Sequence, residues 1–136
     1  MMFHKKKTPP QPNLWKINQN VLELIFECAK SSYPNEFGGF LKTDTTKSFI
    51  ITELVLIPGT ISGDAHAIFQ MHMLPIDYTI VGTIHSHPSP NTTPSSADLA
   101  LFERYGKIHI ISGYPYVNSS WNAFSYKGDK IKLQII

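Results

Sequence analysis

Cysteine is scarce: the 136 residues contain one, Cys28. A single thiol cannot close an intramolecular disulfide, and a zinc site made of four thiolates needs several more. The sequence therefore excludes both a disulfide framework of the secreted type and a cysteine-rich zinc module. We expect a reduced, cytoplasmic setting.

Long hydrophobic runs and a strong charge of one sign are also lacking. The longest apolar stretches, residues 49–57 and 76–84, are interrupted by acidic residues and fall far short of the roughly 20 residues of a membrane span. Lys5–Lys7 precede a proline-rich segment instead of an apolar one, so no signal peptide is expected. The formal net charge of +2 is too balanced to favour nucleic acid. We expect neither a membrane nor a nucleic acid as partner.

The length of the chain fits one domain with a core of its own. Residues 1–13 are polar, basic and rich in proline, a composition that cannot offset the entropy of ordering, so we expect a flexible lead-in. We place the folded domain at residues 14–136.

Hydrophobic periodicity predicts two helices and seven strands. Apolar residues at three- and four-residue spacing indicate a helix from Asn18 to about Ser32, ended by Tyr33-Pro34. A second helix should begin at Ser95 and run to about Tyr105, with Gly106 as its C-terminal cap. Runs rich in aromatic and β-branched residues predict strands at 37–42, 48–57, 66–74, 78–85, 108–113, 121–126 and 130–136. This order favours an α+β domain with a mixed sheet, and we expect loops 58–65 and 114–120 to form a variable surface.

Two histidines end one of the predicted strands. His85 and His87 are two residues apart, so both face one side of the strand, and Pro88 places them at its end. Asp98 lies in the first turn of the second helix, within reach of a fold-back loop. Two imidazoles and a carboxylate, with a fourth position left to water, form the ligand set of a catalytic zinc site. We therefore expect Zn²⁺ as cofactor.

Each part of this pattern also has a purely structural interpretation. An isolated His-x-His is more often a polar strand end, and Ser95 with Asp98 three residues on is typical of a helix capping box. A capping role would compete with a substrate for the Ser95 hydroxyl. The other histidines are expected to be structural or surface residues: His4, His66, His72 and His109.

The combined motif resembles a known family. His85-Ser86-His87-Pro88, followed after six residues by Ser95-Ser96-Ala97-Asp98, is similar to the signature of the JAMM (MPN-domain) metalloproteases. Residues 34–41 resemble the family's upstream Pro-x-Glu-x-x-Gly-x-Leu segment, and residues 110–115 followed by Trp121 resemble its compact archaeal-type members. The resemblance implies a mixed, curled sheet flanked by helices, of the deaminase-like type.

The resemblance also implies a role for each matching residue. His85, His87 and Asp98 would bind one Zn²⁺ per chain together with a water. Glu36 would be the general base, whereas Glu27 and Glu53, the other candidates, lack the glycine-rich context. Ser95 would donate to the developing oxyanion, and Ser86 and Pro88 would support the site.

Two alternative zinc enzymes do not fit the chain. Metal-dependent amidohydrolases need a barrel of typically about 250 residues, and zinc deaminases need a Pro-Cys-x-x-Cys pair. By resemblance we expect a JAMM-type zinc metalloprotease that hydrolyses the amide bond after the C-terminal glycines of a ubiquitin-like protein, most plausibly an isopeptide bond to lysine.

Several alternatives stay open for this activity. One is a peptidase that trims the C-terminus of a ubiquitin-like sulfur carrier, and another is a non-catalytic scaffold module. Residues 69–73 are a candidate wall of the substrate groove, or else a core strand, and the chain could form an oligomer.

Overall fold

The structure is a computed structural model that describes residues 14–57 and 77–136. Several predictions fall outside these residues: the lead-in 1–13, the loop 58–65, the strand 66–74, the groove wall 69–73, and His4, His66 and His72. In chain order the described elements are β1 (Lys16–Ile17), α1 (Gln19–Ser32), β2 (Gly38–Thr43), β3 (Ile50–Leu56), β4 (Ile80–His87), α3 (Ser96–Arg104), β5 (Ile108–Gly113), β6 (Trp121–Ser125), β7 (Lys130–Ile131) and β8 (Gln134–Ile135).

Both predicted helices are confirmed. The spacing of Val21, Leu22, Ile25 and Ala29 gives α1 one apolar face, and all four side chains are buried. α3 begins after Ser95, and Gly106 follows its last turn with φ +117°, a conformation that glycine adopts without a steric penalty. Neither helix in the described ranges is long and apolar enough to cross a membrane.

The strands form one mixed sheet in the order β7-β6-β5-β4-β2-β3-β1-β8. β4 pairs antiparallel with β2 and parallel with β5 near the middle of the sheet. The prediction of a single strand over 130–136 is wrong. This run splits into β7, which pairs with β6 at one edge, and β8, which pairs with β1 at the other. The buried Leu133 lies between them, where the chain crosses from one edge to the other.

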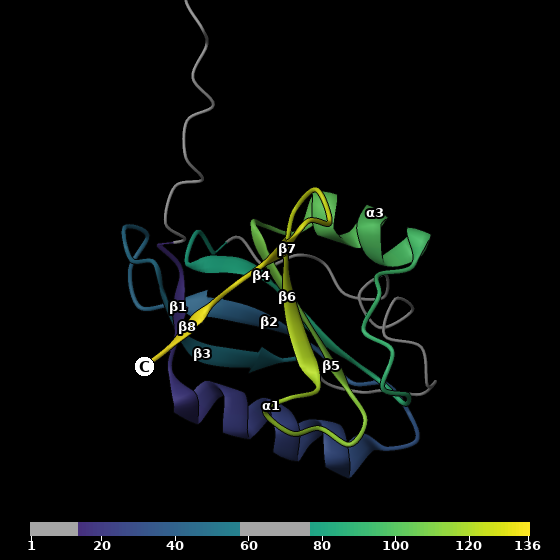
Figure 1. The fold of residues 1–136 in the computed structure, drawn as a ribbon. Helices are drawn as coiled ribbons and strands as arrows, with labels where there is room; N and C mark the ends of the chain where they lie inside the picture. The colour runs from purple at the N-terminus through teal and green to yellow at the C-terminus, as the bar shows by residue number, and fades with distance from the viewer. Residues whose placement is uncertain (1–13, 58–76) are drawn as a thin grey trace, which may run out of the picture.

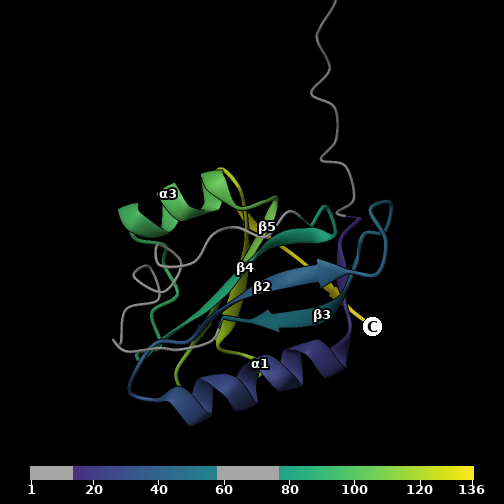
Figure 2. The same ribbon diagram turned by 180° about the vertical axis from the view of Figure 1, so that it is seen from behind.

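The two helices cover opposite sides of this curled sheet (Figures 1 and 2). Successive strand residues alternate between the sides, so Leu41, Ile84 and Ile110 join the larger core cluster with α1. Their neighbours Phe40 and Ile111 pack toward the other side, where α3 contributes its own buried side chains. The expected α+β domain with a mixed, curled sheet flanked by helices is confirmed.

Close backbone contact fixes β4 against β5. A Cβ atom at Gly82 would lie 1.4 Å from the carbonyl oxygen of Ile108, so only glycine fits. β4 is therefore held in a fixed register, with Gly82 beside Ile108 and His85 beside Ile111. This register determines where the two histidines at the end of β4 lie.

Candidate metal centre

β4 carries both histidines on the side of the sheet that α3 covers. His85 is the register partner of Ile111, whose side chain packs with Phe102 of α3 in one cluster. His87, two residues later, lies on the same side at the last position of the strand. Their ring centroids are 5.1 Å apart, and His85 is buried whereas His87 remains partly exposed.

The first turn of α3 places a carboxylate opposite these rings. Asp98 is the third residue of the helix, and its backbone N–H donates to the Ser95 hydroxyl oxygen at 3.0 Å. In return Asp98 Oδ2 accepts from the Ser95 N–H at 2.8 Å, which completes a capping box. Its side chain is buried, and the helix N-terminus favours the negative charge.

Three ligand atoms converge at this point. His85 Nε2 lies 3.0 Å from Asp98 Oδ1, and His87 Nε2 lies 3.5 Å from Asp98 Oδ2. The three side chains offer ligand atoms that all lie within 4.8 Å of one another. Ligands about 2.1 Å from a tetrahedral zinc ion are about 3.4 Å apart, so the spacing and the N₂O donor set fit Zn²⁺.

The surroundings of His87 favour a metal-binding tautomer. Its Nδ1 lies 2.8 Å from the Asn91 carbonyl oxygen, which can only accept, so Nδ1 carries a proton and the neutral ring has its lone pair on Nε2. Burial acts to lower the pKa of His87, but the bond to Asp98, the Asn91 carbonyl and the charges of Asp98 and Glu36 outweigh it and raise the pKa. The pocket around this ring therefore favours positive charge.

Glu36 lies beside the cluster, in the segment between α1 and β2. Ser86 exchanges two hydrogen bonds with Phe37: its Oγ accepts from the Phe37 N–H at 2.8 Å, and its own N–H donates to the Phe37 carbonyl at 3.0 Å. Gly38 pairs with His85, and continuing this antiparallel register by two residues places Glu36 opposite His87. Its charge acts on both His87 and Tyr116.

The other acidic candidates lie elsewhere. Glu27 forms an ion pair with Lys30 on the exposed face of α1, and Glu53 forms one with Lys42 from β3.

The Ser95 hydroxyl caps α3, as the structural interpretation predicts. The expected competition for this hydroxyl does not arise, because the hydroxyl oxygen accepts from Asp98 N–H while its own hydrogen can still donate. Capping and donation to a substrate oxygen are therefore compatible.

His109 is structural, as predicted. It is buried on β5, with Nδ1 2.7 Å from the Thr83 hydroxyl and Nε2 2.9 Å from the Gly106 carbonyl. Phe102 stacks on its ring with centroids 4.4 Å apart, and the same phenyl ring lies 6.4 Å from His85. His109 and Phe102 thus form a packed layer behind the candidate metal ligands.

Sequence reasoning missed two supports of His87. Asn91 acts through its backbone carbonyl, which leaves no signal in a side-chain pattern. Tyr116 donates its hydroxyl hydrogen to the His87 carbonyl at 3.2 Å. The prediction that residues 114–120 form only surface is wrong for Tyr116, since a positive φ of 63° accompanies an almost fully buried ring.

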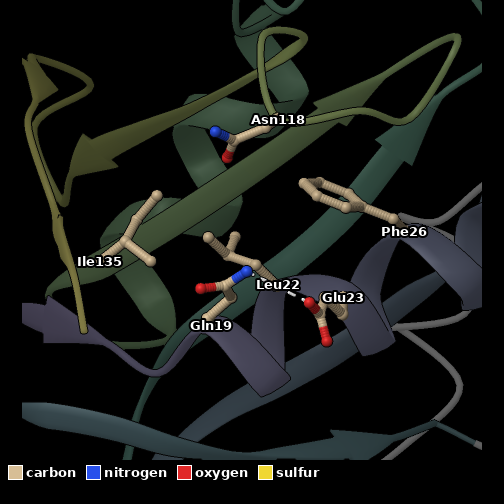
Figure 3. Close-up of a pocket in the computed structure, with 6 residues that line it drawn as sticks. All are labelled: Gln19, Leu22, Glu23, Phe26, Asn118 and Ile135. Atoms are coloured by element: carbon tan, nitrogen blue, oxygen red, sulfur yellow. Dashed lines mark hydrogen bonds between the residues drawn. The ribbon is translucent and has the colours of Figure 1, made fainter.

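A hollow of about 290 Å³ lies on the other side of the sheet, away from this cluster (Figure 3). α1 supplies most of its wall, and Asn118 and Ile135 face α1 across it. A hydrogen bond of 3.2 Å joins Gln19 to Glu23 at its rim. It contains no histidine or cysteine, so we do not assign the candidate chemistry to it.

Comparison with known proteins gives consistent similarities. The model of a family described as prokaryotic homologs of the JAB domain matches residues 18–125. A curated protein of Haloferax volcanii described as a probable metalloprotease is 33% identical over 127 residues, covering 88% of this chain and 78% of its own.

Two solved structures share both fold and sequence with the chain. A JAB1/MPN domain protein from Archaeoglobus fulgidus superposes with a TM-score of 0.72 and 39% identity, over 89% of this chain and 98% of its own. A structure described as JAMM, a metalloprotease-like zinc site in the proteasome and signalosome, gives a TM-score of 0.70 and 36% identity, over 90% and 98% of the two chains.

Proposed function

The chain belongs to the prokaryotic homologs of the JAB domain and has a JAMM-type, metalloprotease-like fold, and from that premise we propose that it hydrolyses the amide bond after the C-terminal glycines of a ubiquitin-like protein. We propose His85, His87 and Asp98 as ligands of one Zn²⁺, Glu36 as general base and Ser95 as oxyanion donor. The observation that carries the proposal is the convergence of two imidazole nitrogens and a buried carboxylate.

The ligand roles follow from the donor set. When bound, Zn²⁺ supplies a Lewis acid that polarises the scissile carbonyl and lowers the pKa of its water. Asp98 contributes negative charge from a fixed position, because the capping box holds its carboxylate and the helix behind it. The Asn91 carbonyl holds His87 in the tautomer that binds through Nε2.

The strand register supports Glu36 as the proposed base, since continuing it from Gly38 and His85 by two residues brings Glu36 opposite His87. Its segment is held to β4 by the paired bonds between Ser86 and Phe37, while Glu36 itself is only partly buried and can meet a substrate. In the proposed reaction its carboxylate takes a proton from the attacking water and returns it to the leaving amine. Such a group contributes about 10² to 10⁴ in rate.

In the proposed reaction Ser95 donates to the substrate oxygen that develops charge. Its oxygen lone pair is used by the Asp98 N–H, and its hydrogen remains to stabilise the oxyanion. Loss of one oxyanion donor typically costs about 2.7–4 kcal/mol of transition-state stabilisation, which exceeds the cost of losing a helix cap.

Substitution of Glu36 tests the proposal. Glu36→Gln should retain about one zinc per chain yet lose about 10²-fold or more in turnover of a ubiquitin-like protein joined to a lysine. His87→Ala should lose the metal as well as the activity. Zinc is measured by elemental analysis and products by mass spectrometry.

Glu53→Gln is the matched control, since this exposed carboxylate pairs with Lys42 away from the cluster. It should keep both metal and turnover. Full activity of Glu36→Gln would contradict the assignment of the base, and failure of the wild type to bind zinc would contradict the proposed centre.

The released ends separate the proposed activity from its alternatives. Cleavage of an isopeptide bond frees a lysine amine, whereas processing of a sulfur carrier frees residues from the end of its own chain. No product from either substrate, with zinc bound, would favour the scaffold. The presence of all three proposed zinc ligands in this chain favours catalysis over the scaffold.

A further inference from the structure

A second hollow, of about 330 Å³, lies at the start of β4. Four segments surround it: the residues before β1, the turn between β2 and β3, the beginning of β4, and the turn that leads into β5. Backbone hydrogen bonds hold these segments together, from Lys16 N–H to the Phe49 carbonyl at 2.9 Å and from Lys107 N–H to the Val81 carbonyl at 2.7 Å. The hollow is therefore part of the fold.

This hollow is separate from the candidate metal centre. Ile80 and Val81 line it at the first positions of β4, whereas His87 is the last residue of that strand. At about 3.3 Å per residue, the two ends of the strand are about 20 Å apart. A ligand bound here would not contact the metal-binding side chains.

Aromatic rings make up much of its wall. Trp15 and Phe49 meet edge to face with centroids 5.1 Å apart, and Tyr78 stands at the rim with 83% of its surface exposed. Phe49 is itself 48% exposed. Rings left this open to solvent offer faces and edges on which a planar ligand ring can stack.

Two lysines add positive charge. Lys47 and Lys107 both line the hollow, and neither forms an ion pair or a cation–π contact with another residue in ranges 14–57 and 77–136. The nearby Asp77 is already occupied, since it accepts from Thr79 and lies 3.3 Å from Lys42. Two ammonium groups beside exposed rings match a ligand that joins an anion to a planar ring.

We propose that this hollow binds a nucleoside monophosphate, with the base against the aromatic wall and the phosphate between Lys47 and Lys107. The volume lies at the lower end of the range of small-molecule sites, which suits one base with one phosphate. Nothing in this inference depends on the proposed hydrolysis.

Titration of the zinc-loaded protein with AMP, followed by amide NMR, tests the site. The largest shifts should fall on Lys47, Phe49, Gly106 and Lys107, with none at His85 or His87. Adenosine and inorganic phosphate should each bind about tenfold or more weakly than AMP, because each supplies only half of the contacts.

Two variants separate charge from stacking. The double variant Lys47→Gln/Lys107→Gln should weaken AMP binding about tenfold or more, while Lys127→Gln/Lys130→Gln, which removes the same charge at the β6–β7 end, should leave it unchanged. Tyr78→Ala should also weaken binding without unfolding the protein, since its ring is exposed.

Three results would overturn the proposal. One is the absence of saturable shifts at millimolar AMP, and another is equal affinity of the wild type and the Lys47/Lys107 double variant. The third is a set of shifts centred on His85 and His87, which would mean that the phosphate binds at the metal centre.

Discussion

His109 couples the stability of the domain to pH. Burial first, and then the nearby charge of His85, lower its pKa from 6.5 to about 4, although its bond to the Gly106 carbonyl acts in the opposite direction. The unfolded chain therefore binds a proton on this residue between pH 6.5 and 4, where the folded chain does not. The contribution of the neutral His109 ring to the free energy of unfolding is complete above about pH 6.5 and is lost as the pH falls toward 4.

We expect the wild type to lose about 2 kcal/mol more free energy of unfolding than His109→Gln between pH 7.5 and pH 5. Denaturant titrations of the metal-free proteins at both pH values measure this difference. The two proteins differ only at residue 109, so the difference between their pH dependences reports on His109. Equal pH dependence of the two proteins would show that His109 is not held in its neutral form.

Substitution of Ser86 tests how Glu36, the proposed general base, is held in place. Ser86→Ala removes the acceptor of the buried Phe37 N–H, which should cost about 1–3 kcal/mol of stability. Because Phe37 follows Glu36, we also expect kcat to fall while the zinc content stays at one per chain. Unfolding curves, turnover and elemental analysis report these three effects.

Ser112→Ala is the matched control for this substitution. Ser112 is the register partner of Ser86 on β5 and equally buried, but its hydroxyl has no hydrogen-bond partner among the residues the structure describes. It should change neither turnover nor zinc content. A similar loss of kcat in both variants would show that Ser86 acts through packing instead of through Phe37.

The residues of the candidate site were largely predictable, because their chemistry depends on side-chain type and local spacing. His85 and His87 share a face through strand periodicity, and Asp98 is fixed by the cap that its own sequence encodes. Their supports were not predictable in the same way. The Asn91 carbonyl belongs to any residue type, and the burial of Tyr116 depends on the path of its loop.

At the scale of elements, the two helices differ in how they begin. Ser95 caps α3 through its side chain, whereas Asn18 at the start of α1 makes no side-chain capping bond. Ser95→Ala should therefore lower the free energy of unfolding by about 1 kcal/mol, and Asn18→Ala should have little effect. Denaturant unfolding of the two variants beside the wild type measures this contrast.

Turnover adds a second readout to the Ser95 variants. Ser95→Thr keeps a hydroxyl and should retain both stability and kcat, whereas Ser95→Ala should lose more in kcat than the cap alone explains. If Ser95→Ala lowers only stability, the residue is a cap and the oxyanion role is wrong.

Elements with strong local signals were predicted, and those that depend on distant partners were not. α1 follows from its apolar spacing, and α3 from its capping box and Gly106. β1 was not predicted, because two residues carry no periodicity, and it exists only through pairing with β3 and β8. Residues 130–136 were likewise predicted as one strand, because their division between two sheet edges depends on pairing with β6 and β1.

At the scale of the whole molecule, the candidate metal centre joins separate parts of the fold. β4 supplies two of the proposed ligands and α3 the third, across a layer of packed side chains. A metal that binds only the folded state should stabilise all of these elements together, by about 2.7 kcal/mol when free zinc is 100 times the dissociation constant.

Thermal unfolding in zinc and in chelator measures this linkage. The midpoint of the wild type should be higher with zinc, and the two midpoints of His87→Ala should coincide. A zinc-dependent midpoint in His87→Ala would place the stabilising metal elsewhere.

The pairing of β1 with β8 has a consequence for folding during synthesis. Its hydrogen bonds join the two extremes of the described chain, and the Ile136 carbonyl accepts from Gln19 N–H in the first turn of α1. On the ribosome, α1, β2 and β3 emerge before β8, so the outer edge of the sheet at β1 stays open until β8 has left the exit tunnel. The nascent domain therefore passes through a state with an unpaired strand edge, which only the arrival of β8 closes.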